Sequence, residues 1–261
     1  MISHKHKSIF IHISKCAGTS VENAFGVPKK MTPPNYDMLY GWSEKHSLHL
    51  QHATPEQLLS KKLITEAQWS DYFTFIIVRN PYSRAYSDYH WVMANSGVYG
   101  SFKDFIMAKG PFKALLTQRN INYMGDHLWS QYDYFHIQGK RISYDRVIRL
   151  ESLATEAPNL AETIGLPKNT FSKKANVASK KLSHYSIFYT EKRKRLVEKY
   201  YKKDLDFLGY QFEDRRASTQ TFLENSKLLF QPKAKLYFRL KYPYLAHRWG
   251  EWKRKWIPRR K

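Results

Sequence analysis

The stretch SIFIHISKCAGTS, residues 8–20, decides the fold of this chain. Isoleucine occupies alternate positions within residues 8–14, which is typical of a β-strand. The segment KCAG, residues 15–18, then turns the chain, and Thr19 or Ser20 is placed to cap a helix that continues to Phe25. These residues therefore predict a strand, a tight turn and a helix in direct succession.

This strand–turn–helix unit is suited to bind an anion. Unpaired backbone N–H groups and the positive end of the helix dipole converge at the first helical turn, where a phosphate group would bind. Lys15 adds a mobile positive charge, while Thr19 and Ser20 add hydroxyl donors. Lys15 precedes Gly18, so the order differs from the Walker loop, in which lysine follows glycine. The alternative is an ordinary strand-to-helix loop that carries a lysine.

Further strands and helices alternate along the chain. FTFIIVR, residues 73–79, is a continuous apolar run typical of a buried parallel strand, and Asn80 and Pro81 then start a helix. RVIRLE at 146–151 is a weaker strand candidate, and residues 190–208 form a charged amphipathic helix pattern. This alternation predicts an α/β fold: a three-layer, P-loop-like domain with a central parallel sheet flanked by helices.

Arg79 is a candidate for a second phosphate contact. It ends the buried strand, at the carboxyl edge where open α/β sheets bind ligands. Ser83 and Ser87 follow on one helical face, so a guanidinium fork and a hydroxyl can act together. A P-loop kinase would place an acid at such a strand end to hold magnesium. The alternative is that Arg79 or Arg84 pairs with a structural carboxylate.

The composition separates a globular domain from a basic tail. The chain has 44 Lys and Arg against 22 Asp and Glu, and 42% hydrophobic residues are enough to fill a core, which excludes wholesale disorder. Residues 215–261 hold fourteen of the basic residues and three of the seven tryptophans. We predict a domain over 1–214 and a basic, aromatic extension over 215–261. The net charge of +22 indicates an anionic ligand or surface.

Cysteine usage and hydropathy indicate a protein of the reducing cytoplasm. The single cysteine, Cys16, excludes a disulfide framework and a multi-cysteine zinc site. We expect Cys16 to be a small residue tolerated beside a phosphate; the alternative is a reactive thiol whose pKa is lowered at the helix N-terminus. The sequence shows neither a signal-peptide pattern nor a run of about 18 apolar residues, so we expect a cytoplasmic location.

The two phosphate motifs together are more specific than either alone. SKCAGTS after IFIHI, followed by VRNPYSRAYSDY, resembles the sulfotransferases that use 3′-phosphoadenosine 5′-phosphosulfate (PAPS). RVIRLESL and HYSIFYTEKRKRLVEKYYKKDLDFLGY are similar to the branch that sulfates polysaccharides such as chondroitin and heparan. The resemblance spans about residues 8–213. It implies metal-free transfer of a sulfuryl group from PAPS to a carbohydrate hydroxyl, leaving 3′-phosphoadenosine 5′-phosphate (PAP).

The resemblance also implies roles for individual residues. The 5′-phosphosulfate would be bound by Lys15, Ala17, Gly18, Thr19 and Ser20, and the 3′-phosphate by Arg79 and Ser87. Lys15 would stabilise the negative charge that grows on the departing phosphate oxygen during in-line displacement. Residues Lys173, Lys174, Asn176 and Ser179 resemble a loop that closes over the nucleotide, with a solvated basic loop as the alternative.

A histidine is expected to take the proton of the acceptor hydroxyl, because its pKa lies near neutrality. Three histidines, His46, His49 and His52, precede a helix start at Thr54. We choose His52 as the general base, because HATPEQL resembles the His-containing segment that supplies the base in this branch. The alternatives are His49 as base, or three exposed loop histidines; the spacing is poor for a three-histidine metal site.

The tail predicts contact with a membrane or with the acceptor. Trp249, Trp252 and Trp256 recur on one helical face among lysines and arginines, a pattern that suits an anionic bilayer surface. Residues 235–261 are therefore expected either to bind the inner face of the cytoplasmic membrane peripherally or, equally, to contact the acceptor. Contact with the acceptor would be a clamp for an acidic polysaccharide; the alternative is tryptophans that pack on the domain. The acceptor itself is expected to be an acidic or neutral carbohydrate, free or lipid-linked, and no nucleic acid is expected.

Two other functions compete with the sulfotransferase hypothesis. A non-enzymatic module that binds acidic glycan or nucleic acid would use the basic surface, but it gives no reason for Lys15 and Arg79 to follow two strands. A nucleotide-dependent kinase would need magnesium, and Arg79 stands where its acid would be expected. The sequence therefore favours a carbohydrate O-sulfotransferase with Lys15 and His52 as catalytic residues.

Overall fold

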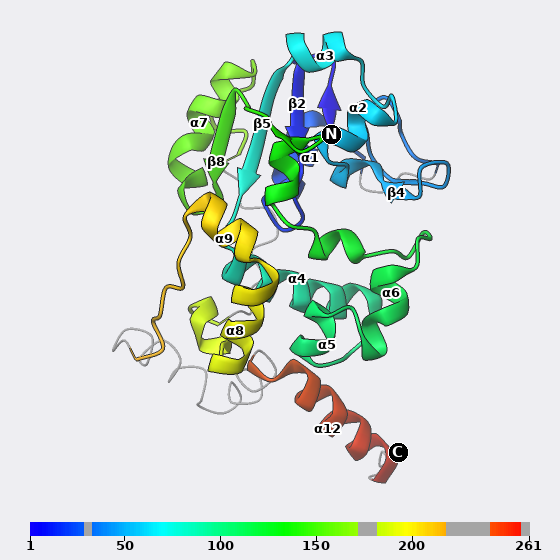
Figure 1. The fold of residues 1–261 in the computed structure, drawn as a ribbon, viewed down its shortest axis with the longest axis vertical. Coiled ribbons are helices and arrows are strands. Elements are labelled where there is room, and N and C mark those ends of the chain that lie inside the picture. Colours follow the sequence, from blue (N-terminus) through cyan, green and yellow to red (C-terminus); the bar gives the residue numbers. More distant parts are fainter. Residues whose placement is uncertain (29–32, 172–181, 218–240, 257–261) are drawn as a thin grey trace.

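A four-stranded sheet in the order β1–β2–β5–β8 forms the centre of the computed structural model, which describes residues 1–28, 33–171, 182–217 and 241–256 (Figure 1). The strands are β1 Ile2–Ser3, β2 Ser8–Ile11, β5 Phe73–Val78 and β8 Arg146–Arg149. β2, β5 and β8 are parallel, and β1 pairs with β2 in the antiparallel sense. The predicted α/β fold is confirmed, with one antiparallel strand added at the edge of the parallel sheet.

Helices flank this sheet and extend beyond its carboxyl edge. The α-helices of the described residues are α1 Gly18–Phe25, α2 Pro55–Ser60, α3 Glu66–Asp71, α4 Pro81–Ser96, α5 Phe102–Ile106, α6 Lys113–Thr117, α7 Leu153–Thr163, α8 Glu191–Tyr200, α9 Lys202–Leu208 and α12 Pro243–Trp256. The 3-10 helices are η1 Leu50–His52, η2 Gly110–Phe112, η3 Gly125–Leu128, η4 Tyr132–Phe135, η5 Leu150–Ser152 and η6 Tyr185–Phe188. Two short antiparallel pairs join β3 Trp42–Ser43 to β4 Leu48–His49, and β6 His136–Ile137 to β7 Lys140–Arg141.

The register of β2 and β5 brings the loops after both strands to one edge. Phe10 pairs with Phe75, and their rings stack 4.9 Å apart in the core. Both strands are almost wholly buried, as their continuous apolar sequences require in a covered parallel sheet. β2 ends at Ile11, before the predicted end at residue 14, so His12 already belongs to the loop that leads to α1.

The helix starts explain which cap predictions hold. Thr54 and Gln57 form a complete capping box at α2, and Asn80 accepts a hydrogen bond from the Tyr82 N–H at α4, as predicted. The prediction that Thr19 or Ser20 caps α1 is wrong. Ala17 occupies the N-cap position in a left-handed conformation and makes no side-chain cap, so both hydroxyl residues lie within the first turn.

The helix predicted over 190–208 is two helices. α8 ends at Tyr200 and α9 begins at Lys202, with Tyr201 between them at φ −114° and ψ 27°. The break places Asp204 in the interior, where it accepts hydrogen bonds from the backbone N–H groups of Gln131 and Tyr132, each at 3.0 Å. α9 therefore fixes the chain segment that crosses the carboxyl edge of the sheet.

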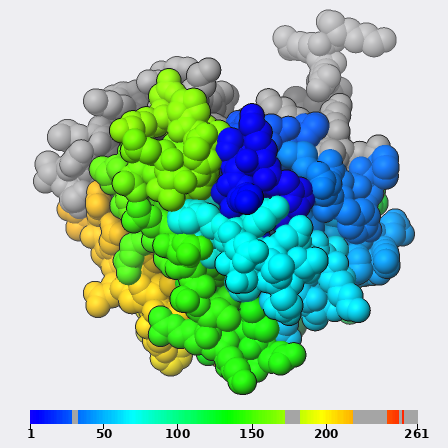
Figure 2. All heavy atoms as spheres, turned by 90° about the horizontal axis from the view of Figure 1, so that it is seen from above, coloured from blue at the N-terminus to red at the C-terminus, as the bar shows by residue number. Residues whose placement is uncertain are grey.

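Two hydrophobic cores lie on either side of that edge. One surrounds the sheet and includes Phe10, Phe75 and Ile148, while the other packs α4 against α5 and α8 through residues such as Tyr89 and Phe188. Figure 1 shows β5 running toward α4, with α5 and α8 beyond it. Figure 2 shows the first residues, in dark blue, at the surface beside the light-green residues of the α7 region.

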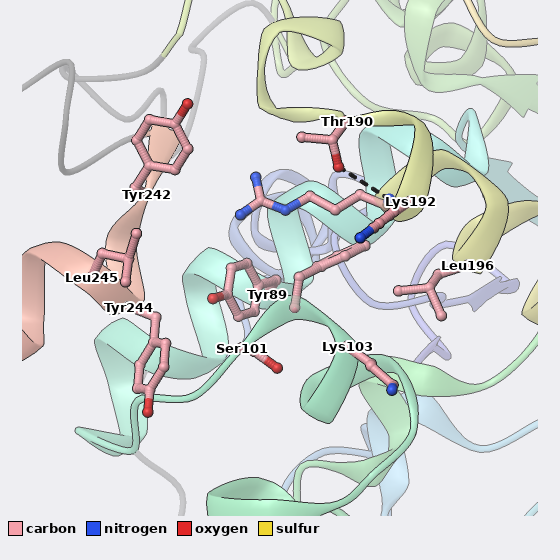
Figure 3. A pocket seen from close by; sticks show the side chains of 11 residues that line it. Tyr89, Ser101, Lys103, Thr190, Lys192, Leu196, Tyr242, Tyr244 and Leu245 are labelled. Atoms are coloured by element: carbon pink, nitrogen blue, oxygen red, sulfur yellow. Dashed lines mark hydrogen bonds between the residues drawn. The ribbon is translucent and has the colours of Figure 1, made fainter.

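The tail helix α12 packs on the main domain. His247 stacks on Tyr99 with 3.9 Å between ring centres, and Arg193 donates to the Lys241 carbonyl at 3.3 Å. A cavity of about 350 Å³ separates α12 from α5 and α8. Figure 3 shows Tyr242, Tyr244 and Leu245 on one side of it and Tyr89, Lys103 and Lys192 on the other.

The structure describes only part of the tail to which the predictions refer. The side chains of Trp249, Trp252 and Trp256 and the ranges 218–240 and 257–261 lie outside the described residues. The boundary at 214 and the membrane contact of 235–261 therefore stay predictions. No helix in the described ranges is both long and apolar enough to cross a membrane.

Candidate active site

Lys15 and Arg79, the two predicted phosphate-binding cations, meet at the carboxyl edge of the sheet. Lys15 follows β2 and Arg79 follows β5, so the parallel pairing of these strands places them side by side. Arg79 Nη1 donates to the Lys15 carbonyl at 3.1 Å. Lys15 adopts φ 60°, a left-handed conformation that is sparsely populated for lysine. Such backbone strain is concentrated at functional sites.

In the part of the chain that the structure describes, neither cation forms an ion pair with a carboxylate. Among the described residues, no Asp or Glu oxygen lies within 4.0 Å of the Lys15 ammonium or the Arg79 guanidinium. Burial lowers the pKa of Lys15, and the nearby Arg79 lowers it further against the opposing effect of Asp88. Two half-buried cations that have no carboxylate within ion-pair distance in the described ranges favour binding of an external anion, because desolvating a charge is costly unless it is paired.

Arg84 pairs with structural carboxylates, which was the alternative role predicted for Arg79 or Arg84. Its side chain is 2% exposed and pairs with Asp88 at 3.4 Å and Asp204 at 4.0 Å. It also donates to the carbonyls of Ser14 and Trp129. These contacts rigidify the loops around the site, and they distinguish Arg84 from Arg79.

The first turn of α1 is open toward an anion. The N-cap residue, Ala17, makes no side-chain cap, so this turn presents the positive end of the helix dipole without a capping side chain, while the Ser20 N–H donates to the Ala17 carbonyl at 2.9 Å. Gly18 is required there: a Cβ at this position would lie 1.8 Å from Nε2 of His12. Thr19 and Ser20, the other predicted contacts, are half-buried in the same turn.

The Arg79 guanidinium contacts Ser83, whereas Ser87 was the predicted partner. Arg79 Nε donates to Ser83 Oγ at 3.0 Å, and Ser83 lies in the first turn of α4. Ser87, the predicted partner, is half-buried one turn further along the same helix. Ser83 orients the guanidinium, and Ser87 remains a predicted contact for the same phosphate.

Gln131 joins the Arg79 backbone to the segment that crosses this edge. It is fully buried; its Oε1 accepts the Arg79 N–H at 2.9 Å, and its Nε2 donates to the Arg79 carbonyl at 2.7 Å. This side chain imitates a neighbouring strand and fixes the end of β5. No sequence motif marked it, since an isolated glutamine has no pattern.

Cys16 is not a reactive thiol. Its side chain is buried, and burial raises its pKa to about 12, so the alternative of a lowered pKa is wrong. The physical reason is that the thiol faces the core and not the open turn of α1. Cys16 is the small residue tolerated within the loop.

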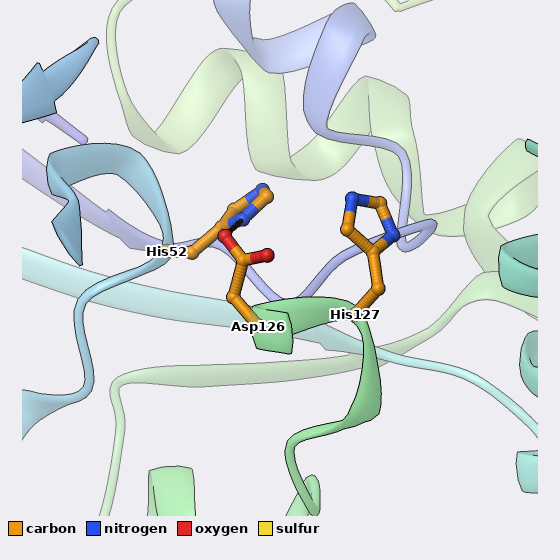
Figure 4. A group of neighbouring side chains, drawn as sticks. All are labelled: His52, Asp126 and His127. Carbon is orange, nitrogen blue, oxygen red and sulfur yellow. Dashed lines mark hydrogen bonds and ion pairs between the residues drawn. The ribbon is translucent and has the colours of Figure 1, made fainter. Parts of the chain in front are cut away.

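His52, the predicted base, forms a buried pair with Asp126 (Figure 4). The His52 Nδ1 and an Asp126 carboxylate oxygen are 2.5 Å apart, and both side chains are buried. Burial would raise the pKa of Asp126, but the neighbouring His52 and His127 and the hydrogen bond from His52 hold it below its usual range. Asp126 therefore accepts the Nδ1 proton and leaves Nε2 as the free, basic nitrogen of His52.

The other predicted histidines do not share this geometry. His49 Nε2 lies 2.9 Å from the Tyr123 carbonyl, so that nitrogen carries the proton and donates it. Burial also lowers the pKa of His49. His46 packs against Tyr36. The idea of three exposed loop histidines is wrong for His52, which is 8% exposed.

A second histidine–aspartate pair lies beside the first. His127 Nδ1 is 2.5 Å from an oxygen of Asp88, and the His127 ring lies 5.7 Å from that of His52. Ligand atoms of His52, Asp126 and His127 lie within 4.8 Å of one another. Both Nδ1 atoms are already held by carboxylates, so the cluster is accounted for without a metal ion. The adjacent acid and histidine at 126–127 were the only sequence signal for this part of the site.

A polar cavity of about 340 Å³ is lined by residues that lie close to His52 and Asp126 in sequence, but neither His52 nor Asp126 is among them. It is lined by Thr54, Glu56, Gln57, Ser60, Arg119, Trp129 and Asp133. Arg119 is held over the rings of Tyr123 and Trp129, at 4.2 and 5.4 Å from their centres. The predicted nucleotide loop with Lys173, Lys174, Asn176 and Ser179 lies outside the described residues.

Comparison with known proteins agrees with this geometry. A model of the sulfotransferase family matches residues 1–211, which is most of the chain and includes every residue of the site described above. Searches of the curated proteins and of the solved structures gave no significant match. The chain therefore belongs to the sulfotransferase family.

Proposed function

We propose that this sulfotransferase uses PAPS to sulfate a carbohydrate hydroxyl. The observation that carries the proposal is the meeting of two cations, Lys15 and Arg79, that have no carboxylate partner among the described residues and lie beside the open first turn of α1. PAPS presents two separate anionic groups, a 5′-phosphosulfate and a 3′-phosphate. Two cations from two adjacent strands match that pattern better than a single phosphate would.

Each end of the donor has its own set of residues in this proposal. Lys15, with the backbone of Ala17 and Gly18 and the hydroxyls of Thr19 and Ser20, binds the 5′-phosphosulfate at the positive end of α1. Arg79, oriented by Ser83, binds the 3′-phosphate with Ser87.

The acid that follows β8 does not suit a kinase. Both Glu151 oxygens accept hydrogen bonds from the protein, one from the Asn80 N–H at 2.9 Å and one from the Tyr210 hydroxyl at 2.8 Å. A kinase would need an acid at this edge to hold magnesium. Glu151 instead fixes the start of α4, so the described edge favours sulfuryl transfer.

His52 and Lys15 act on opposite sides of the transferred group. His52 Nε2 accepts the proton of the acceptor hydroxyl while the hydroxyl oxygen forms its bond to sulfur, and Asp126 stabilises the imidazolium. The donor supplies the sulfuryl group, whose bond to the phosphate oxygen breaks. Lys15 and the N-terminus of α1 stabilise the charge that this oxygen gains.

The lining of the polar cavity between Thr54, Arg119 and Trp129 supports a carbohydrate acceptor. It combines hydroxyl and amide groups with one arginine, two carboxylates and the Trp129 ring. Hydroxyl-rich sugars need this mixture of donors and acceptors, whereas a flat apolar phenol would not. We propose that the acceptor binds here, and that the basic residues of 235–261 keep the enzyme near an anionic membrane face when the acceptor is lipid-linked.

A turnover assay with two variants tests the proposed function. PAP release from PAPS is measured with and without polysaccharide acceptors. Lys15→Ala is expected to lower kcat more than nucleotide affinity, because Lys15 acts on the departing oxygen. Arg79→Ala is expected to weaken PAP binding about 10- to 100-fold while hardly changing the binding of adenosine 5′-monophosphate, which lacks the 3′-phosphate. If the two nucleotides are affected equally, the assignment of Arg79 is wrong.

A further inference from the structure

Trp91 faces the ammonium group of Lys15. The Lys15 Nζ lies 5.4 Å from the centre of the Trp91 ring, within the range of about 6 Å over which an indole attracts a cation. Trp91 lies on α4, so it comes from the same helix as the serines beside Arg79. It is half-buried, and neither the family match nor the phosphate motifs single it out.

The indole is fixed from behind by the second histidine–aspartate pair. The His127 ring stacks on Trp91 with 4.4 Å between centres and 16° between planes. Asp88 holds His127 Nδ1 at 2.5 Å and also accepts from Ser14 Oγ at 3.1 Å. Ser14 precedes Lys15, so the array is anchored on the loop that carries the lysine. The His127–Asp88 pair, which is not the proposed base, therefore has a structural role in holding Trp91.

An indole suits this place better than a carboxylate would. A carboxylate beside Lys15 would hold the ammonium, but its full negative charge would repel the anionic donor and cancel the attraction of Lys15. The face of an indole attracts a cation without adding a net charge. It also limits the rotation of a lysine side chain that has four flexible bonds.

We propose that Trp91 is a positioning residue, which holds the Lys15 ammonium toward the departing phosphate oxygen. This inference rests on the role proposed for Lys15. It predicts that Trp91 acts on catalysis only through that lysine. Loss of the indole should therefore lower kcat, with little effect on binding of the nucleotide as a whole.

A double-mutant cycle tests this coupling. Trp91→Leu is expected to lower kcat about tenfold, with KM for PAPS and Kd for PAP changed by less than about threefold, and Trp91→Phe is expected to recover most of the loss. In a Lys15→Ala background, Trp91→Leu should cost less than about twofold. Trp69→Leu, at a half-buried tryptophan on α3, is the matched control and should leave kcat unchanged. An equal loss from Trp91→Leu in both backgrounds would overturn the inference.

A second readout is independent of turnover. Reductive methylation with ¹³C-formaldehyde labels the lysines, and the signal missing in Lys15→Arg identifies Lys15. The Trp91 ring current should shift this signal upfield, and Trp91→Leu should return it to the range of the other lysines. An unshifted Lys15 signal in the unaltered chain would overturn the inference. An upfield signal in a chain that turns over no PAPS would support the contact and contradict only the proposed function.

Discussion

The pairing of His52 with Asp126 is the residue-scale feature that most constrains the chemistry. A carboxylate at 2.5 Å fixes which imidazole nitrogen carries the proton, and Nε2 is left to act as a base. His52→Ala is expected to lower kcat about 100-fold or more, with little change in KM for PAPS. Asp126→Asn is expected to lower kcat about 10- to 100-fold, because the asparagine can stabilise the wrong tautomer. Steady-state kinetics measure both, and full turnover by His52→Ala would contradict the assignment.

Gly18 gives a residue-scale test of the phosphate loop. Its missing side chain makes room for His12, whose Nε2 lies where a Cβ would be placed. His12 is buried and packs 4.7 Å from the His52 ring, so it has little room to move. Gly18→Ala is expected to lower the free energy of unfolding by about 1–3 kcal/mol and to weaken PAP binding.

Gly26→Ala is the control for this substitution. A Cβ at Gly26, the C-cap of α1, would have no atom within 4 Å, so it creates no clash. Its φ of 72° is left-handed, and alanine there is expected to lower the free energy of unfolding by about 1–2 kcal/mol. Calorimetric titration with PAP separates the two variants, because only Gly18→Ala should weaken nucleotide binding. Equal PAP affinity in both variants would contradict the assignment of Gly18 to the phosphate loop.

Residues in motifs were predictable from the sequence, and their partners were not. Lys15 and Arg79 were identified because each follows a strand that the pattern of its apolar residues predicts. Asp126 and Gln131 become part of the site only through contacts across long stretches of chain, such as the 74 residues that separate His52 from Asp126, whereas Ser83 lies four residues from Arg79. One sequence has no periodicity that relates such positions.

At the scale of elements, α4 joins the site to the second core. It carries the serines beside Arg79, the Asp88–Trp91 array and His90. The His90 ring packs between Tyr86 and Phe188, and its Nε2 is buried without a hydrogen-bond partner among the described residues. Burial lowers the pKa of His90 to about 4, and Arg193 adds to this effect.

This histidine predicts how stability depends on pH. Between its unfolded pKa near 6.5 and its folded pKa near 4, the unfolded chain binds a proton that the folded chain does not. The free energy of unfolding should therefore fall as the pH is lowered through this window. His90→Phe is expected to reduce that slope in urea melts. An unchanged slope in His90→Phe would show that His90 is already protonated in the folded protein.

Element boundaries failed where tertiary contacts decided them. The capping box at α2 and the Asn80 cap of α4 were predicted correctly, because these caps depend on two to four neighbouring residues. The break at Tyr201 was missed, because the charged pattern continues through it. Its cause is distant: Asp204 must reach the segment at 130–132.

In the whole molecule, we expect the basic tail to provide attraction to anionic surfaces and the main domain to bind the nucleotide. Removal of residues 218–261 takes away most of the basic extension, along with the α12 contact made by His247 on Tyr99. The shortened chain is expected to lose binding to vesicles of phosphatidylglycerol at low salt but to retain PAP binding. Vesicle sedimentation and calorimetry measure the two properties. Undiminished sedimentation would contradict the role of the tail and assign the membrane contact to the main domain.

The central claim is that the edge formed by Lys15, Arg79 and α1 binds the two anionic ends of PAPS. Titration calorimetry of the unaltered chain with PAP and with ADP, both in EDTA, tests it most directly. PAP is expected to bind without metal at one site per chain and ADP to give little heat, because only PAP carries the 3′-phosphate that Arg79 would bind. Equal binding of both nucleotides, or no binding of either, would contradict it.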